Sequence, residues 1–360
     1  MTKSKLNFKI LINRLILFIG VGVLLHIIFV LSTTERKLLS YVNKLSLLHI
    51  IIMACLMLIP WVGYATRVRM WSRFLGETIN FKDALRIVMT ADLASALSPT
   101  AVGGAPVKAA LLLNRGFNPG SVGFMLTWGI IEDIFFYISG ILLALYFSQN
   151  LVFDIGSKVS HFISSHSFYI LAFLIISLIY IMSIRYNLIP RTLRPIHYLP
   201  ARLKQKIYDL RARFYQSITE MNINFSKAWK HGKLRMLLSI TILFVQWCAK
   251  FSVLAVILKA FEIDFDTIQI YIRQWVIYVT MLFIPTPGAS GGAEASFLLI
   301  FGKSIPSEIS FLIVSIWRFF TYYYVLIASV VLYMSISFIS KKQEDIELDT
   351  FEKTESTAVK

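Results

Sequence analysis

Long apolar runs separated by short polar connections cover most of this chain. A helix rises 1.5 Å per residue, so a run of about 20 residues can cross a hydrocarbon core about 30 Å thick. We predict six membrane-spanning helices, at about 10–31, 45–65, 119–147, 168–184, 236–258 and 308–339. The pattern therefore indicates an all-α polytopic membrane protein.

Two further apolar regions are interrupted by proline and glycine. The motif PTAVGGAP separates residues 84–98 from 107–115, and PTPGASGGA separates 270–284 from 294–302. Each arm has roughly 10 to 15 residues, which is too short to cross a membrane. Proline removes a backbone donor and glycine permits sharp turns, so both regions are predicted to be re-entrant helical hairpins.

The two hairpins indicate an internal repeat. Residues 98–105 align with 286–293, sharing a proline and the sequence Gly-Gly-Ala, and in each half two spans precede the hairpin and one follows it. We predict an inverted-topology repeat of about 10–147 and about 168–339, an architecture typical of alternating-access transporters. The whole would form one integral domain, 1–340, followed by a polar, mixed-charge tail, 341–360, predicted to be disordered.

Charge sets the predicted orientation. Hydrophobic residues make up 57% of the 360 positions, and the net charge is +16. With the amino terminus in the cytoplasm, cytoplasmic segments contain 27 of the 36 Lys and Arg residues and outer segments contain 7. The positive-inside rule therefore predicts a protein of the cytoplasmic (inner) membrane with both termini in the cytoplasm. The same rule explains most of the net charge without any nucleic-acid partner.

The broken hairpins are the first candidate substrate site. Backbone groups freed at membrane depth must be buried in protein or line a wet cavity, and the amino termini of the second arms would favour an anion. The alternative is a packing role, in which small residues let helices approach closely. The candidate residues here are Pro99, Gly103, Gly104, Pro287, Gly291, Gly292 and Glu294.

Charged residues inside apolar runs are the second candidate. Glu132, Asp133 and Arg318 lie within predicted spans, where a charge needs a partner or water. The repeat places them on equivalent helices, which favours an acid–Arg pair with either a structural or a substrate role. Lys108 and Arg115 of the first hairpin would attract a phosphate headgroup or serve only as positive-inside anchors.

Three other features have weaker functional implications. Asp92 is a further candidate in the first hairpin, whereas Lys250 is expected to extend toward the membrane surface. The basic loop 185–235 contains an amphipathic helix that suits an anionic leaflet or packs beneath the bundle. Two cysteines and six scattered histidines provide no disulfide framework and no metal site, and no cofactor is predicted.

PTPGASGGAEASF followed by a span containing Arg318, and SPTAVGGAPVKAALLLNRG before Glu132, resemble a known family. The chain is similar over about 6–340 to the flippase-like transmembrane domain of lysylphosphatidylglycerol synthases. The resemblance implies movement of an anionic phospholipid or a polyprenyl-linked lipid between leaflets. Aminoacyl transfer belongs to a separate soluble domain in those synthases, and about 20 polar residues follow the last span here, so we expect no enzyme activity.

Three alternatives remain at this point. The chain could be a secondary transporter of a small solute or anion, a lipid-modifying enzyme, or a scaffold that recruits a lipid synthase through the basic loop. The enzyme has no two-carboxylate metal motif or nucleotide-binding loop to support it. The expected partners are therefore anionic membrane lipids, and the alternatives are a second copy of the chain or a separate lipid synthase.

Overall fold

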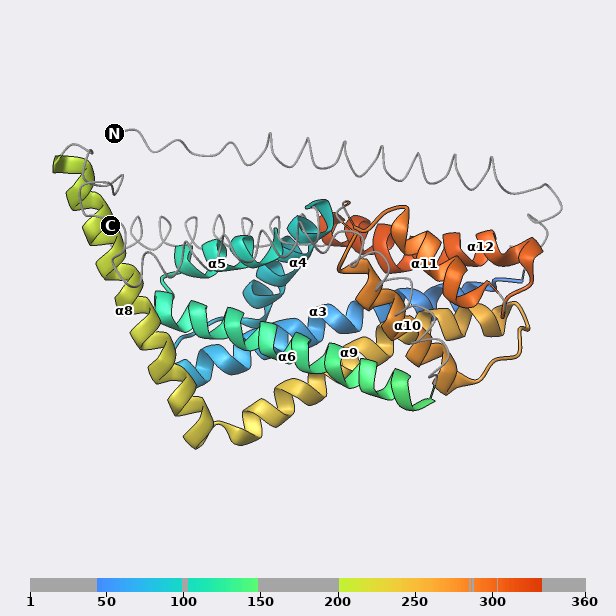
Figure 1. Ribbon diagram of the computed structural model, residues 1–360, viewed down its shortest axis with the longest axis horizontal. Coiled ribbons are helices and arrows are strands. Elements are labelled where there is room, and N and C mark those ends of the chain that lie inside the picture. Colours follow the sequence, from blue (N-terminus) through green and yellow to red (C-terminus); the bar gives the residue numbers. More distant parts are fainter. Residues whose placement is uncertain are drawn as a thin grey trace, which may run out of the picture.

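The computed structural model describes residues 44–98, 103–147, 201–284, 286, 288–302 and 304–331. These residues form helices and no strand, which confirms the all-α class for this part of the chain (Figure 1). The helices are α3 (Leu47–Leu75), α4 (Phe81–Leu97), α5 (Gly104–Asn114), α6 (Pro119–Phe147), α8 (Ala201–His231), α9 (Lys233–Ala260), α10 (Thr267–Met281), α11 (Gly292–Phe301), α12 (Ser307–Arg318) and the π-helical segment η3 (Phe319–Tyr324). The predicted spans 10–31 and 168–184, the tail 341–360, Pro99 and Pro287 lie outside the described residues.

Among the described residues, four helices are long and apolar enough to cross a membrane: α3, α6, α9 and the continuous helical stretch Ser307–Val331, which contains α12 and η3. They match four of the six predicted spans. One boundary was wrong, because α3 does not end near residue 65 but runs to Leu75, where Gly76 caps it with a left-handed φ of 85°. Three arginines assigned to a cytoplasmic connection, Arg67, Arg69 and Arg73, therefore belong to this helix.

Each proline–glycine motif separates two short helices, as predicted. Helices α4 and α5 flank the first break, and α10 and α11 flank the second. Within each pair the two helices pack against each other, so each break is the turn of a helical hairpin. Of the second turn, residues 286 and 288–291 are described. The lengths of 17 and 11 residues in the first hairpin, and 15 and 10 in the second, leave every arm shorter than a membrane span.

The core consists of two hydrophobic clusters, one around each hairpin. The first cluster joins α3, α4, α5 and the first half of α6, and contains Trp71, Phe124 and Trp128. The second joins α9, α10, α11 and α12 and contains Phe251, Phe297 and Trp317. Helices α3 and α9 lie side by side through the middle of the bundle (Figure 1). Consequently α3, α9 and the second half of α6, whose Phe136 lies in the second cluster, connect the two hairpin units.

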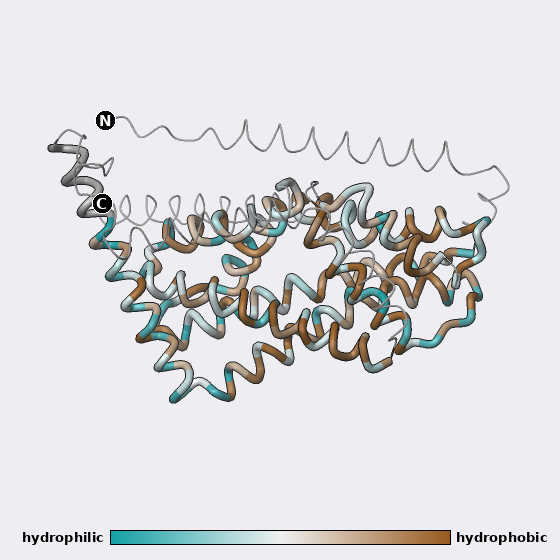
Figure 2. The backbone as a smooth tube through the Cα atoms, in the orientation of Figure 1, coloured by the Kyte–Doolittle hydropathy of each residue, from teal (hydrophilic) through white to brown (hydrophobic). Residues whose placement is uncertain are grey.

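The outward surface of the bundle is apolar, as a lipid-facing surface should be. On α6 the exposed side chains Ile130, Ile134, Ile138 and Leu142 recur every four residues and form one stripe. Figure 2 shows hydrophobic positions throughout the bundle and hydrophilic ones along α8 and the connection between α9 and α10. Both cysteines, Cys55 and Cys248, are exposed on apolar spans.

Helix α8 runs across one end of the bundle (Figure 1). Its residues Met221 and Phe225 pack against the first cluster, and the Phe225 ring lies 4.7 Å from that of Phe124. The packing interpretation of the amphipathic helix is therefore confirmed for this part of α8. Phe214 and Trp229 remain exposed on the same helix, so packing against the bundle does not cover all its large apolar side chains.

Candidate functional site

The hairpin turns depend on glycine for two different physical reasons. Gly104 opens α5 where a Cβ atom would overlap the Ser95 hydroxyl of α4, so its role is close helix approach. Gly291, the residue before α11, has a φ of 81°, which side chains other than glycine rarely adopt. Gly103 precedes α5 and Gly292 opens α11, while Pro99 and Pro287 lie outside the described residues.

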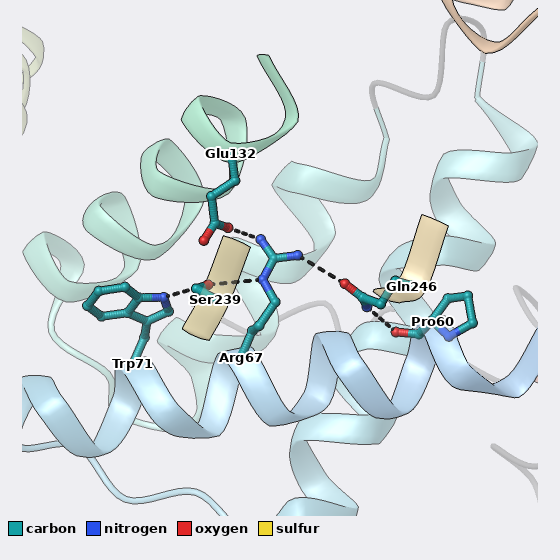
Figure 3. A network of polar contacts seen from close by, with 6 residues as sticks. All are labelled: Pro60, Arg67, Trp71, Glu132, Ser239 and Gln246. Atoms are coloured by element: carbon teal, nitrogen blue, oxygen red, sulfur yellow. Dashed lines mark hydrogen bonds and ion pairs between the residues drawn. The ribbon is translucent and has the colours of Figure 1, made fainter. Parts of the chain in front are cut away.

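A buried ion pair joins Arg67 of α3 to Glu132 of α6. Arg67 also donates to Ser239 Oγ at 3.2 Å and to Gln246 Oε1 at 3.3 Å, both on α9 (Figure 3). Gln246 in turn donates to the carbonyl oxygen of Pro60, within α3. This network therefore fixes α3, α6 and α9 to one another inside the bundle.

The sequence prediction that Glu132 or Asp133 pairs with Arg318 was wrong. Glu132 is only 1% exposed and pairs with Arg67, while Asp133 is partly buried and forms no ion pair among the described residues. Arg318 pairs instead with Glu294, at 2.9 Å between Arg318 Nε and Glu294 Oε1. Each arginine therefore has a carboxylate partner supplied by its own half of the chain.

Arg318 ties the last span to the second hairpin. Besides its pair with Glu294 of α11, it donates a hydrogen bond to the carbonyl oxygen of Gly288, within the second turn. Its guanidinium carbon lies 4.5 Å from the ring centroid of Tyr322, one turn further along the helix. Arg318 thus contacts both the turn and the second arm of this hairpin.

Tyr322 brings the two hairpins together. Its hydroxyl donates to the carbonyl oxygen of Ala96 at 3.0 Å, near the end of α4, and its ring lies against Gly288, where a Cβ atom would overlap it. Tyr322 belongs to η3, the π-helical segment that interrupts the last span just after Arg318. A π-helical turn inside an α-helix frequently marks a functional site. One side chain therefore touches the tips of both hairpins.

A central cavity of about 300 Å³ lies between the two halves. Its wall comes from α3, α4, α6, α9, α10, the second turn and η3, and its polar lining includes Tyr64, Asp92, Gln246, Lys250, Arg318 and Tyr322. Leu282, at the end of α10, also lines it and is 49% exposed, which places an apolar rim at the surface of the bundle.

A second cavity, of about 210 Å³, lies within the first half, and we call it the first-half cavity. It brings together four of the predicted site residues, which are Gly104, Lys108, Glu132 and Asp133. Tyr64, Asp92 and Ser95 line both cavities, so they form a shared wall. The carboxylate of Asp92 accepts a hydrogen bond from Trp61 Nε1 at 2.8 Å.

Arg115 lies away from both cavities. It forms an ion pair with Asp83 across the base of the first hairpin, at 2.6 Å between Arg115 Nη1 and Asp83 Oδ2. Hydrogen bonding from this guanidinium lowers the pKa of the Asp83 carboxyl below its ordinary value. The geometry of Arg115 therefore indicates a clamp between α4 and the end of α5.

Four residues that sequence reasoning missed line the cavities or join their walls. The sequence assigned Arg67 to a connection and Lys250 to the membrane surface, but Arg67 is buried in α3 and Lys250 lines the central cavity. Gln246 and Tyr322 were not considered. A periodic signal was present for Arg67, because Trp61, Tyr64, Val68 and Trp71 recur at three- and four-residue steps and place Arg67 beside the same buried face. Within the described part, no cluster of three or more His, Cys, Asp or Glu side chains could hold a metal ion.

Comparisons with known proteins agree with this architecture. The family model described as the lysylphosphatidylglycerol synthase TM region matches residues 16–329. The chain belongs to this family. The matched part is the transmembrane region of the synthases. This chain is a multi-pass membrane protein, with four candidate spans among its described residues.

One curated relative is similar over most of its length. It is a "UPF0104 membrane protein" from Archaeoglobus fulgidus, 27% identical over 318 residues, which cover 84% of this chain and 92% of the relative. No solved structure matches the chain. The family is thus established by sequence, and the cavities described above add the geometry.

Proposed function

We propose that this member of the lysylphosphatidylglycerol synthase TM region family translocates an anionic phospholipid or polyprenyl-linked lipid between the leaflets of the cytoplasmic membrane. The observation that carries the proposal is the meeting of both hairpin tips at Tyr322, beside a cavity between the two halves. A cavity at that place would open alternately to each side if the two halves moved relative to each other.

The architecture that we infer is six transmembrane helices plus two re-entrant hairpins, inserted as an inverted repeat with both termini in the cytoplasm. Its support is the matching order of elements, in which a long helix, a hairpin and a second long helix occur as α3 to α6 and again as α9 to η3. The repeats would extend over about 10–147 and about 168–339. The basic loop 185–235 would then lie on the cytoplasmic side, where anionic lipids attract Lys and Arg.

The size and rim of the central cavity fit a lipid headgroup whose tails stay outside. About 300 Å³ is at the lower end of small-molecule pockets, and exposed Leu282 and Phe283 stand at the end of α10. Acyl chains could remain in the bilayer beside such a rim. The protein would therefore have to desolvate only the polar headgroup within the cavity.

Reconstitution into vesicles tests the proposal directly. With fluorescent phosphatidylglycerol placed in both leaflets, an external membrane-impermeant quencher should reach the inner-leaflet pool only in vesicles that contain the protein. Arg318→Ala, which detaches the last span from the second hairpin, should reduce this rate while membrane insertion is retained. Equal quenching in protein-free and protein-containing vesicles would reject lipid translocation.

Transport of a small anion is the second candidate, because a cavity of about 300 Å³ could enclose a small solute entirely. The same vesicles distinguish the two functions. A solute transporter would accumulate a labelled small anion, and the lipid distribution between leaflets would stay unchanged.

A further inference from the structure

Two of the arginines buried in the bundle have their charge neutralised by an adjacent carboxylate. Arg67 pairs with Glu132, and Arg318 pairs with Glu294. Lys250 of α9 is different, because no ion pair or hydrogen bond of its ammonium group is found among the residues that the structure describes. A charged side chain inside a membrane segment without an ion-pair partner points to a ligand.

Two aromatic rings hold the ammonium of Lys250. Its Nζ lies 4.8 Å from the ring centroid of Trp247 and 4.5 Å from that of Tyr278. Cation–π attraction offsets part of the cost of removing the ammonium from water, but it leaves the positive charge in place. The three N–H donors of Lys250 therefore remain available to an anion in the central cavity, which Trp247 and Tyr278 also line.

The balance of charges favours the central cavity over the first-half cavity as the anion site. Apart from the Arg318–Glu294 pair, the charged side chains of the central cavity are one cation, Lys250, and one carboxylate, Asp92. Apart from the Arg67–Glu132 pair, those of the first-half cavity are one cation, Lys108, and two carboxylates, Asp133 and Asp92. An anion entering the first-half cavity would meet more negative than positive side chains.

We propose that Lys250 binds the phosphate group of the transported molecule in the central cavity, and that Asp92 limits how tightly it is held. The inference rests on the proposed function and deepens it, since it assigns the phosphate group to one cation. Asp92 lines the same cavity from α4, and Lys250 lines it from α9. A transported group must be released from its site after it has bound. A nearby carboxylate that repels the phosphate weakens its binding and so favours release.

Binding of a short-chain lipid to the full-length protein in detergent tests this assignment. The probe is dihexanoyl phosphatidylglycerol, measured by isothermal calorimetry, and the variants are Lys250→Met and, as a matched control, Lys259→Met on the exposed last turn of the same helix. Lys250→Met should weaken binding by at least about tenfold, as expected for a charge-assisted contact in a desolvated site. Lys259→Met should bind like the wild type. Equal affinities in the two variants would overturn the assignment.

Stability separates binding from a structural role. Because Lys250 has no ion pair to lose within the described structure, Lys250→Met should melt at the same temperature as the wild type or higher. A melting temperature lowered together with affinity would indicate a structural residue and overturn the proposal. Lys250→Gln provides a second neutral variant with the same expectation.

Asp92→Asn is predicted to change affinity in the opposite direction. Removing a negative charge from the wall should tighten phosphatidylglycerol binding by about threefold or more. Unchanged or weaker binding would contradict the role given to Asp92. If, in the same assay, Asp92→Asn binds the lipid more tightly and Lys250→Met binds it more weakly than the wild type, the anion lies close to both side chains.

Two further ligands identify the source of the phosphate. Dihexanoylglycerol, which has no phosphate, should bind equally weakly to the wild type and to Lys250→Met. Glycerol 3-phosphate tests whether a free solute can bind at the same place. If it competes with the lipid in the wild type but not in Lys250→Met, the site recognises a phosphate group, which a free solute can carry. If only the lipid binds, the ligand is a lipid headgroup. Failure of the proposed function is recognised separately, because a wild type that binds phosphatidylglycerol through Lys250 but moves none would reject translocation and retain the phosphate site.

Discussion

The two halves of the bundle have the same order of elements but use their buried arginines differently. In the first half, Arg67 and Glu132 join two long helices, α3 and α6, and Arg67 reaches across to α9 of the other half. In the second half, Arg318 and Glu294 join the last span to a hairpin arm, and Arg318 also holds the hairpin turn. The Arg67–Glu132 pair therefore connects the long helices, which we call the frame (α3, α6 and α9). The Arg318–Glu294 pair connects a hairpin to its neighbouring span.

The two ion pairs also differ in how far they are exposed to solvent. The side chains of Arg67 and Glu132 are 7% and 1% exposed, whereas Glu294 is 23% exposed beside a buried Arg318. A fully desolvated pair is strongly destabilising when one partner is removed, because the other charge is left uncompensated. The first pair should therefore dominate stability, and the second should affect movement of the hairpin more than folding.

The largest expected effect is that of Glu132→Ala, which leaves Arg67 buried without its carboxylate. We expect a loss of about 3–5 kcal/mol in the free energy of unfolding, measured by thermal and denaturant unfolding of the purified protein in detergent. The matched control is Asp133→Ala, the adjacent acid, which forms no ion pair within the described structure and attracts Arg67 only from a greater distance. Its loss of stability should be clearly smaller, and equal losses in the two variants would contradict the assigned pairing.

The double variant Arg67→Met/Glu132→Leu sharpens the same test. Replacing both partners of a buried ion pair with apolar groups is often neutral for stability, so this variant should recover most of the loss seen in Glu132→Ala. A double variant as unstable as the single one would show that the hydrogen bonds to Ser239 and Gln246, and not the ion pair, connect the frame.

Glu294→Gln should have a smaller effect on stability and a clear one on transport. Arg318 keeps its bond to Gly288 and its contact with Tyr322, and water can reach the site, so we expect a loss of about 1–2 kcal/mol. Lipid movement in vesicles should fall further than stability, because the hairpin arm is no longer held to the last span. Glu308→Gln, on the exposed first turn of α12, is the matched control and should match the wild type in both assays.

The apolar pattern predicted the long helices because bilayer thickness constrains their length, and it predicted the hairpin breaks because proline and glycine act on the local backbone. The outcome was different for the charges. The sequence becomes less hydrophobic after residue 65, so Arg67 was assigned to a connection between helices. In the structure α3 continues to Leu75, and Arg67 is buried.

Partners of buried charges depend on tertiary contacts that a sequence repeat does not encode. Sequence symmetry paired Glu132 with Arg318, yet each has a partner in its own half. Lys250 shows the same limit in reverse, because its position near the end of a span suggested a surface location, while Trp247 and Tyr278 enclose it beside the central cavity.

Tyr322→Phe tests whether contact between the hairpin tips restrains them. The substitution removes one hydrogen bond, to the carbonyl of Ala96, and keeps the ring over Arg318, so it should cost about 1 kcal/mol, or about fivefold in an opening equilibrium. The readout is the rate at which a thiol reagent modifies Ser95→Cys in a background where Cys55 and Cys248 are replaced by serine. That rate should rise several-fold in Tyr322→Phe. Tyr146→Phe, at an exposed position on α6, should leave it unchanged.

The smallest expected effects concern two solvent-exposed ion pairs, of which the first lies at the base of the first hairpin. Arg115 lowers the pKa of Asp83, so Asp83 favours folding while it is ionised, and this contribution is lost as the pH falls below the ordinary range for an aspartate. The pair is partly exposed, so solvent screening limits its contribution to less than about 1 kcal/mol. Asp83→Asn should therefore lower the unfolding midpoint slightly at neutral pH, and the difference from the wild type should vanish in acid. Glu262→Gln removes the more exposed pair between Glu262 of the second half and Lys44 of the first, and its effect should be smaller still, since water surrounds that carboxylate. If Glu262→Gln were the more damaging variant, exposure would not be what sets the strength of the charge pairs in the two halves.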